Sequence, residues 1–185
     1  MSPLTLSRPG TDESAPFYHG YIDKVPGERI GEYLTSQLGE VERLLAPLDD
    51  ATGRFRYAPE KWSVKEVLGH LCDAERIFAY RLLRIGRADT TPLPGFDEDA
   101  YVPPAEFDAR PLAELLREFQ AVRASTIALV EGLPSAGWDR RGQASGKVIS
   151  TRAIAYILVG HVTHHLAVLR DRYRLSSSPD ALAAV

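Results

Sequence analysis

Four stretches of about 20 residues carry apolar side chains at every third or fourth position, and this pattern constrains the fold more than any other feature. They cover residues 27 to about 48, 63 to about 85, 111 to about 133, and 150 or 151 to about 173. Such spacing places the apolar groups on one face of an α-helix. No convincing alternation of the β type lies between them. The sequence therefore predicts an all-α protein, a four-helix bundle.

The segments outside these stretches set the expected domain limits. Residues 1–25 are rich in Pro, Ser and Gly and lack periodicity, which predicts an irregular N-terminal arm that lies on the domain. The bundle domain should span residues 26–175, and residues 176–185 should form a flexible tail. Residues 137–151 are polar and contain glycine, so they hold either a short hairpin or only a turn.

A proline-rich connection separates the second and third predicted helices. Residues 87–107 include four prolines and a glycine, a composition that disfavours a long helix and predicts an extended loop of about 20 residues. Loops of that length in compact domains usually serve a function or bind something. The alternative, a solvated loop pinned by Phe96 and Tyr101, fits the residues equally well.

Length and charge exclude several classes of protein. A chain of 185 residues suits one domain, and its net charge of −3 gives no overall attraction to nucleic acid. The apolar runs are far shorter than the roughly 20 residues that a membrane span needs. The first residues contain no apolar signal core, so we expect a cytoplasmic protein. A single cysteine, Cys72, excludes an internal disulfide and a cysteine-based zinc cluster.

Histidines supply the clearest chemical signal. On a helical wheel of residues 150–173, His161 and His165 each lie about 20° from the centre of the apolar face, and His164 lies near its edge at about 80°. Histidines four positions apart on one helical face are spaced to chelate a metal ion. The alternative is a pair of hydrogen-bonded core residues, but a helix interior offers few partners for four ring nitrogens. The pair therefore favours a metal site.

A third ligand is expected from the second helix. His70 lies about 100° from Leu71 on the wheel, so it flanks the apolar face. That position suits a ligand reaching into a cleft, and it equally suits a half-exposed surface histidine. Three imidazoles with open positions resemble a catalytic site more than a closed structural one, and either Zn²⁺ or Ni²⁺ would suit them. Cys72 points about 200° away from His70 and is expected to be a small buried group.

Charged residues of the second helix receive weaker assignments. Asp73 and Glu75 could hydrogen-bond a ligating imidazole, although a solvated helix face is the default for both. The same helix carries a row of arginines that is expected to form a basic surface edge, with contact to an anionic substrate as the alternative: Arg76, Arg81, Arg84 and Arg87. His19 shows no partner in the sequence.

Three segments of the sequence carry recognisable motifs: residues 61–76 (KWSVKEVLGHLCDAER), residues 96–101 (FDEDAY) and residues 160–165 (GHVTHH). They resemble, in that order, the second-helix signature, a loop and the last motif of the DinB superfamily, particularly of its YfiT-like branch. The resemblance extends over about residues 27–175. It implies a four-helix bundle, often dimeric, with a metal site of one histidine from the second helix and two from the last. By motif these are His70, His161 and His165.

The same resemblance implies an activity. Characterised members of the family include S-transferases that use bacillithiol, mycothiol or glutathione and a mycothiol-dependent maleylpyruvate isomerase, and others are described as metal-dependent hydrolases. We therefore expect a cytoplasmic homodimeric enzyme whose divalent ion activates water or a low-molecular-weight thiol toward a small-molecule substrate. No nucleic acid and no membrane is expected as a partner. The alternative is a non-catalytic dimerisation or stress-response module with a structural or vestigial histidine cluster.

Overall fold

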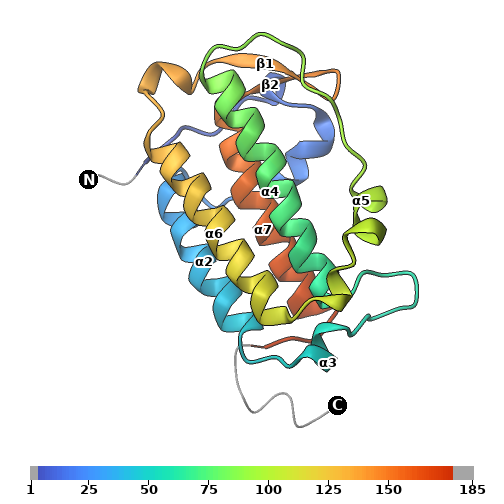
Figure 1. The fold of residues 1–185 in the computed structure, drawn as a ribbon. Coiled ribbons are helices and arrows are strands. Elements are labelled where there is room, and N and C mark those ends of the chain that lie inside the picture. The colour runs from blue at the N-terminus through green and yellow to red at the C-terminus, as the bar shows by residue number, and fades with distance from the viewer. Residues whose placement is uncertain (1–3, 177–185) are drawn as a thin grey trace.

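The computed structural model describes residues 4–176 and confirms the four-helix bundle (Figure 1). The bundle helices are α2 (Ile30–Leu45), α4 (Val64–Gly86), α6 (Leu112–Glu131) and α7 (Thr151–Asp171). Shorter helices are α1 (His19–Ile22), α3 (Asp50–Gly53) and α5 (Glu98–Ala105), with 3₁₀ turns at Thr11–Glu13, Pro16–Tyr18, Phe107–Ala109 and Ser135–Gly137. Two strands, β1 (Arg141–Ala144) and β2 (Lys147–Ser150), form an antiparallel hairpin, one of the two predicted options.

The order of the helices around the bundle differs from their order along the chain. Both α4 and α2 pack chiefly against α6 and α7, so α2 stands diagonally opposite α4, and α6 stands diagonally opposite α7. The first residues of α4 and α6 lie close together, because Lys65 Nζ donates to the Arg110 carbonyl at 2.6 Å. Helices α4 and α6 therefore run parallel, while α2 and α7 run in the opposite direction (Figure 1).

Parallel neighbours require a connection as long as the helices themselves, and residues 87–111 provide it. A 23-residue helix such as α4 is about 35 Å long, and the chain must return over that length before α6 begins. The prediction of an extended loop is wrong at residues 98–105, where α5 forms two turns on the side of α4. The Asp97 side chain caps α5 by accepting from Asp99 and Ala100 N–H. Its prolines, Pro103 and Pro104, stand in the last turn, so they limit the helix without preventing it.

Local signals in the sequence fix where the two histidine-bearing helices begin. The Ser63 hydroxyl accepts from the Glu66 N–H at 3.0 Å, and the Glu66 carboxylate accepts from the Ser63 N–H at 2.7 Å. These two hydrogen bonds form a capping box at the start of α4. At the start of α7, the Ser150 hydroxyl accepts from the Ala153 N–H at 2.9 Å. Both helices therefore have a defined phase, which sets the direction of every side chain along them.

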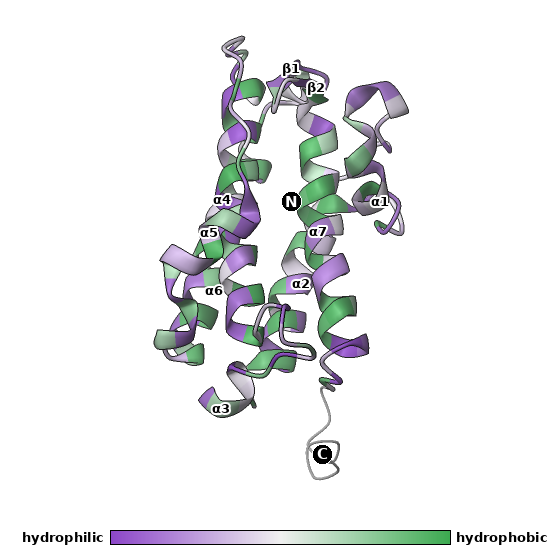
Figure 2. Cartoon of the chain, turned by 90° about the vertical axis from the view of Figure 1, so that its right-hand side faces the viewer, coloured by the Kyte–Doolittle hydropathy of each residue, from purple (hydrophilic) through white to green (hydrophobic). Residues whose placement is uncertain are grey.

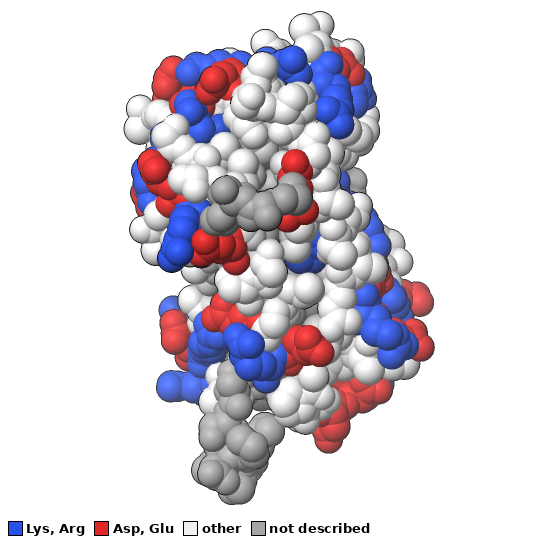
Figure 3. All heavy atoms as spheres, turned by 90° about the vertical axis from the view of Figure 1, so that its left-hand side faces the viewer, with Lys and Arg blue, Asp and Glu red and all other residues white. Residues whose placement is uncertain are grey.

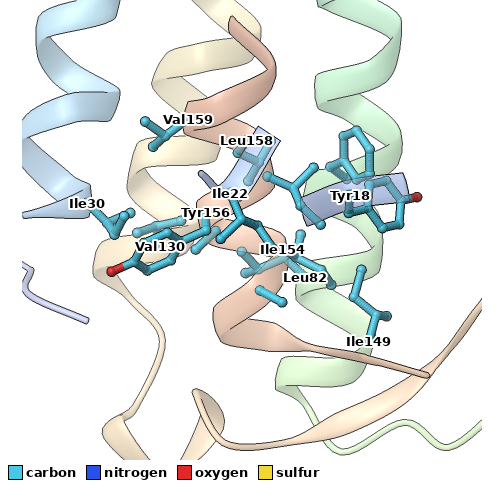
Figure 4. Packing of buried hydrophobic residues seen from close by; sticks show 14 of the residues in the cluster. Tyr18, Ile22, Ile30, Leu82, Val130, Ile149, Ile154, Tyr156, Leu158 and Val159 are labelled. Atoms are coloured by element: carbon cyan, nitrogen blue, oxygen red, sulfur yellow. The ribbon is translucent and has the colours of Figure 1, made fainter. Parts of the chain in front are cut away.

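The N-terminal arm is more ordered than its composition suggests, and it completes the core. Tyr18 and Ile22 are buried against α7 and α4 (Figure 4). The Tyr156 hydroxyl donates to the Leu6 carbonyl at 2.7 Å, which ties the start of the arm to α7. At Gly160 the arm lies so close that a Cβ atom would be 2.0 Å from the Tyr21 carbonyl oxygen. Only glycine permits that approach.

A polar layer crosses the middle of the bundle and divides its core into two apolar clusters. Glu75 of α4 and Arg123 of α6 form an ion pair at 2.7 Å, and both are almost fully buried. Arg123 also donates to the Gln37 side chain of α2 at 3.0 Å, and Gln37 donates to the Val159 carbonyl of α7 at 2.8 Å. The layer thus connects all four helices, and the candidate site described below lies at the same level.

The surface shows no separation of charge on the face drawn in Figure 3, where acidic and basic side chains are interspersed. Helix α7 is long and apolar enough to cross a membrane by length and composition alone. However, 72% of its most apolar window is buried inside the bundle, as expected for a core helix. The predicted tail lies outside the described residues except for Ser176.

Candidate metal centre

Three histidine side chains from two helices meet in the polar layer: His70 of α4 and His161 and His165 of α7. The Nε2 atoms of His70 and His161 are 2.9 Å apart, and those of His165 and His161 are 3.1 Å apart. All three ligand atoms lie within 4.8 Å of one another. The three residues singled out in the sequence are therefore brought together.

The converging nitrogens fit a divalent ion better than they fit one another. Two nitrogens bound at about 2.0–2.1 Å to one ion lie about 2.9 Å apart at a right angle and about 3.3 Å apart at the tetrahedral angle. The observed 2.9 and 3.1 Å are close to that range. Without an ion, Nε2 of His161 has only one proton or one lone pair for two short contacts, so it makes at most one well-directed hydrogen bond. A cation at the centre would use all three lone pairs.

Burial also keeps the three imidazoles in the form that binds metal. It lowers the pKa of His70 to about 4 and holds the pKa values of His161 and His165 well below the usual 6.5. For His161 and His165 the neighbouring imidazoles lower the pKa further, because a second positive charge nearby is unfavourable. The side chains are therefore neutral at pH 7, as metal ligation requires.

His70 is more buried than the helical wheel predicts. It was expected to flank the core, yet its residue is only 7% exposed. The wheel considers one helix at a time, and α7 together with Trp62 covers the flank of α4 on which His70 stands. The Trp62 ring lies 4.7 Å from the His70 ring between centroids. The interpretation as a half-exposed surface histidine is therefore wrong.

A cavity of about 520 Å³ opens onto all three histidines. Its other walls come from the arm, from α4 and the preceding Trp62, from the connection that carries α5, and from Ser145 at the hairpin turn. Figure 2 shows α1 beside α7 and α5 beside α4, so these short helices flank the two histidine-bearing helices. A second cavity of about 280 Å³ shares Trp62 and His165 with the first and also includes His164. The centre thus faces open space, as a site that must admit a reactant requires.

The structure also decides the predictions made for four other residues of α4, of which those for Glu75 and Arg81 are wrong. Glu75 does not lie on a solvated face, because it is buried and paired with Arg123. Arg81 does not belong to a surface edge, because its residue is 1% exposed. Asp73 is half-buried and lies 3.6 Å from Arg76. Cys72 is buried as predicted, and burial raises the pKa of its thiol.

The sequence left Tyr21 and Trp62 without a role, although both contact the histidines. The Tyr21 ring lies edge-on to those of His161 and His164, at 5.3 and 5.5 Å between centroids. It stands in the arm, where no periodicity marks its direction. Trp62 precedes the Ser63 cap, which is the position of a hydrophobic staple, and this signal could have placed it against the start of α4.

Fold and cluster together define a class of protein, a helical bundle in which three buried imidazoles from two helices face a cavity. The model of the DinB superfamily matches residues 33–169, well over half of the sequence, and the chain belongs to that superfamily. No curated protein matches the sequence.

A solved structure supports the same fold. The chain resembles YfiT from Bacillus subtilis, described as a probable metal-dependent hydrolase with an unusual four-helix bundle topology. The two chains share 19% identity with a TM-score of 0.67, over 90% of this chain and 91% of the other. At that identity the likeness supports the fold alone.

Proposed function

We propose that the protein is a metal-dependent enzyme that activates water or a low-molecular-weight thiol for attack on a small-molecule substrate. One observation carries the proposal: three neutral imidazole nitrogens from α4 and α7 converge within 4.8 Å at the wall of a cavity. His70, His161 and His165 would hold the ion, which is Zn²⁺ or Ni²⁺ by the chemistry of the ligands. When bound, such an ion supplies Lewis acidity that brings the pKa of a coordinated water or thiol toward neutral.

The aromatic residues around the centre would hold the imidazoles in position and shield them from solvent. Tyr21 and Trp62 pack their rings against the histidines and limit the directions in which the imidazoles can turn. Because the imidazoles are buried, an interaction made there is weakened less by solvent than one at the surface. These residues fix the ligand nitrogens before any reactant enters, which is the preorganisation that catalysis needs.

Both hydrolysis and S-transfer fit the space available. The cavity of about 520 Å³ is large enough for a small organic substrate, and an attacking water needs no further room. The second cavity, of about 280 Å³, shares Trp62 and His165 with the first and is large enough that a thiol co-substrate would have room beside the substrate. The same geometry therefore supports either branch of the proposal.

Metal content tests the first step. We expect about one divalent ion per chain after purification without chelator, measured by elemental analysis. His161→Ala should lose the ion, whereas the control His164→Ala should retain it, because His164 is adjacent to the centre but outside the three-histidine group. An ion-free wild type that takes up no Zn²⁺ or Ni²⁺ in titration would contradict the proposal.

An activity assay tests whether the metal centre is catalytic, and it distinguishes a catalytic centre from a structural one. The loaded enzyme should hydrolyse activated esters or amides, or transfer a thiol to an electrophile, and His161→Ala should lose that activity. If chelation lowers the melting temperature strongly while no reaction is found on either panel, the centre is structural and the module is non-catalytic.

The proposal includes the setting in which the enzyme works. From the family resemblance we propose a homodimer, which analytical ultracentrifugation tests, and a cytoplasmic location, which fractionation tests. Neither nucleic acid nor membrane is proposed as a partner, since the net charge is −3 and the most apolar helix is mostly buried.

A further inference from the structure

Arg81 carries a buried charge that no carboxylate neutralises. Its residue is 1% exposed, and among residues 4–176 no Asp or Glu oxygen lies within ion-pairing distance of it. Arg123, the other fully buried arginine, has Glu75 as its partner at 2.7 Å. Burying an unpaired charge lowers the stability of the fold, so the buried position of Arg81 needs an explanation other than stability.

The contacts that Arg81 does make are neutral. Its guanidinium lies 5.7 Å from the ring centroids of both Phe78 and Phe96, and it donates to the Pro94 carbonyl at 2.8 Å. It also donates to two hydroxyl groups, Ser145 Oγ at 3.2 Å and the Tyr18 phenol at 3.3 Å. Aromatic faces and neutral acceptors stabilise a cation only in part.

Tyr18 and Ser145 both line the cavity that the three histidines also line. Because each accepts a hydrogen bond from Arg81, each retains its own hydrogen for another acceptor. Ser145 pays a conformational cost to stand there, since its φ of 53° lies in the left-handed region at the hairpin turn before Gly146. Glycine or asparagine would suit that turn better. A strained non-glycine residue beside a cavity is a pointer to function.

We propose that the Tyr18 and Ser145 hydroxyls, backed by Arg81, form a carboxylate-binding subsite in this cavity. It would fix a substrate that carries one carboxylate on an apolar body. The inference deepens the proposed function, because the subsite would orient the substrate toward the histidine centre.

Phe78 supplies the surface between the two ends of the cavity. Its ring centroid lies 5.8 Å from that of Tyr18 and 6.1 Å from that of His161. An apolar body lying along Phe78 would therefore reach from the hydroxyl pair toward the imidazoles. Glu98 also lines the cavity. Burial raises the pKa of the Tyr18 phenol, and the charge of Glu98 helps to raise it further. Because the Glu98 residue is exposed, water weakens its repulsion of a bound carboxylate.

Equilibrium binding of a matched probe pair tests the subsite without relying on catalysis. The probes are 4-phenylbutyrate and its amide, which share one apolar body and differ in charge. Binding is measured by calorimetry on chelated protein, because a carboxylate could otherwise bind to a metal ion. We expect the chelated wild type to prefer the carboxylate by about tenfold or more, since a hydrogen bond to a charged group is stronger than one to a neutral group.

Variants locate the preference. Tyr18→Phe and Ser145→Ala each remove one hydroxyl and should reduce the preference severalfold, while the affinity for the amide changes little. Arg81→Met should abolish it, and the exposed controls Arg87→Met and Ser36→Ala should leave it unchanged. If circular dichroism shows that Arg81→Met does not fold, the two hydroxyl variants still test whether the subsite causes the preference for the carboxylate.

Three results would overturn the inference: equal affinities for the two probes, a preference that appears only in metal-loaded protein, or hydroxyl variants that keep the full preference. These outcomes are separate from failure of the proposed function. Protein that binds no metal but prefers the carboxylate would support the subsite while contradicting the enzyme. Catalytically active protein that binds both probes equally would support the proposed enzyme while contradicting the subsite.

Discussion

Replacing Gly160 with alanine tests whether the N-terminal arm is an integral wall of the site. The added Cβ would lie 2.0 Å from the carbonyl oxygen and 2.5 Å from the carbonyl carbon of Tyr21. Carbon atoms in comfortable contact are about 3.5–4.0 Å apart, so the backbone of the arm must retreat by more than about 1 Å. That movement withdraws the Tyr21 ring from His161 and loosens Ile22 in the core.

The size of the effect follows from two opposing contributions. Overpacking a well-packed interior costs about 1–3 kcal/mol, and a clash with backbone belongs at the upper end of that range. Alanine inside a helix is about 1 kcal/mol more favourable than glycine. We therefore expect Gly160→Ala to lower the free energy of unfolding by about 1–2 kcal/mol.

A second glycine provides the matched control, because its substitution should have the opposite sign. A Cβ at Gly39 in α2 meets only Arg43 Nη1 at 3.2 Å, the end of a flexible side chain. Gly39→Ala should therefore raise the free energy of unfolding by up to about 1 kcal/mol. Urea unfolding followed by circular dichroism measures both, and limited proteolysis reports whether the arm is released. If both variants are stabilised equally and the arm stays protected, the close docking on Gly160 is refuted.

Two further predictions concern the polar layer. In chelated protein, the free energy of unfolding should fall as the pH drops below about 6.5, because the unfolded chain then takes up protons on His70, His161 and His165 that the folded chain refuses, at about 1.4 kcal/mol per proton and pH unit. Urea titrations at pH 7, 6 and 5 measure this, and a slope in His161→Ala as steep as that of the wild type would contradict the assignment. Arg123→Met should cost about 3–5 kcal/mol by leaving Glu75 buried without its partner, and adding Glu75→Leu should recover much of the loss. If Arg123→Met alone has nearly wild-type stability in urea unfolding, the ion pair between Arg123 and Glu75 does not stabilise the polar layer.

Those parts of the fold that depend on short-range patterns could be predicted from the sequence. The capping box at Ser63 and the 3.6-residue period set the phase of α4, and the same period placed His161 and His165 together on the inner face of α7. Helical phase is a local property, so the candidate ligands of α7 could be named from this chain alone. His70 could be proposed as the third ligand from its place on the flank of the apolar face of α4, although that position left two interpretations open, and the family resemblance pointed to the same residue.

Features that depend on packing between distant segments could not be predicted in this way. Arg81 belongs to an apparently basic row of α4, and it is buried only because Pro94 and Ser145 come from elsewhere to cover it. Tyr21 reaches His161 only because Gly160 leaves room for the arm. No pattern within α4 or within the arm contains that information, since each contact depends on the path of another segment.

That path also explains why this bundle has a cavity at its histidines. Because α4 and α6 are parallel, residues 87–111 must return along the whole bundle, and they do so on the side of α4 (Figures 1 and 2). They bring Phe96 and Glu98 to the wall of the cavity that His70 also lines. The arm covers the neighbouring side of α7 and brings Tyr18 and Tyr21. A bundle in which a short antiparallel turn followed α4 would lack the wall that carries Gly95, Phe96 and Glu98, and this side of the histidine cluster would be open to bulk water. The parallel pair is thus the feature of the topology that turns a buried histidine cluster into a site that a small molecule can enter.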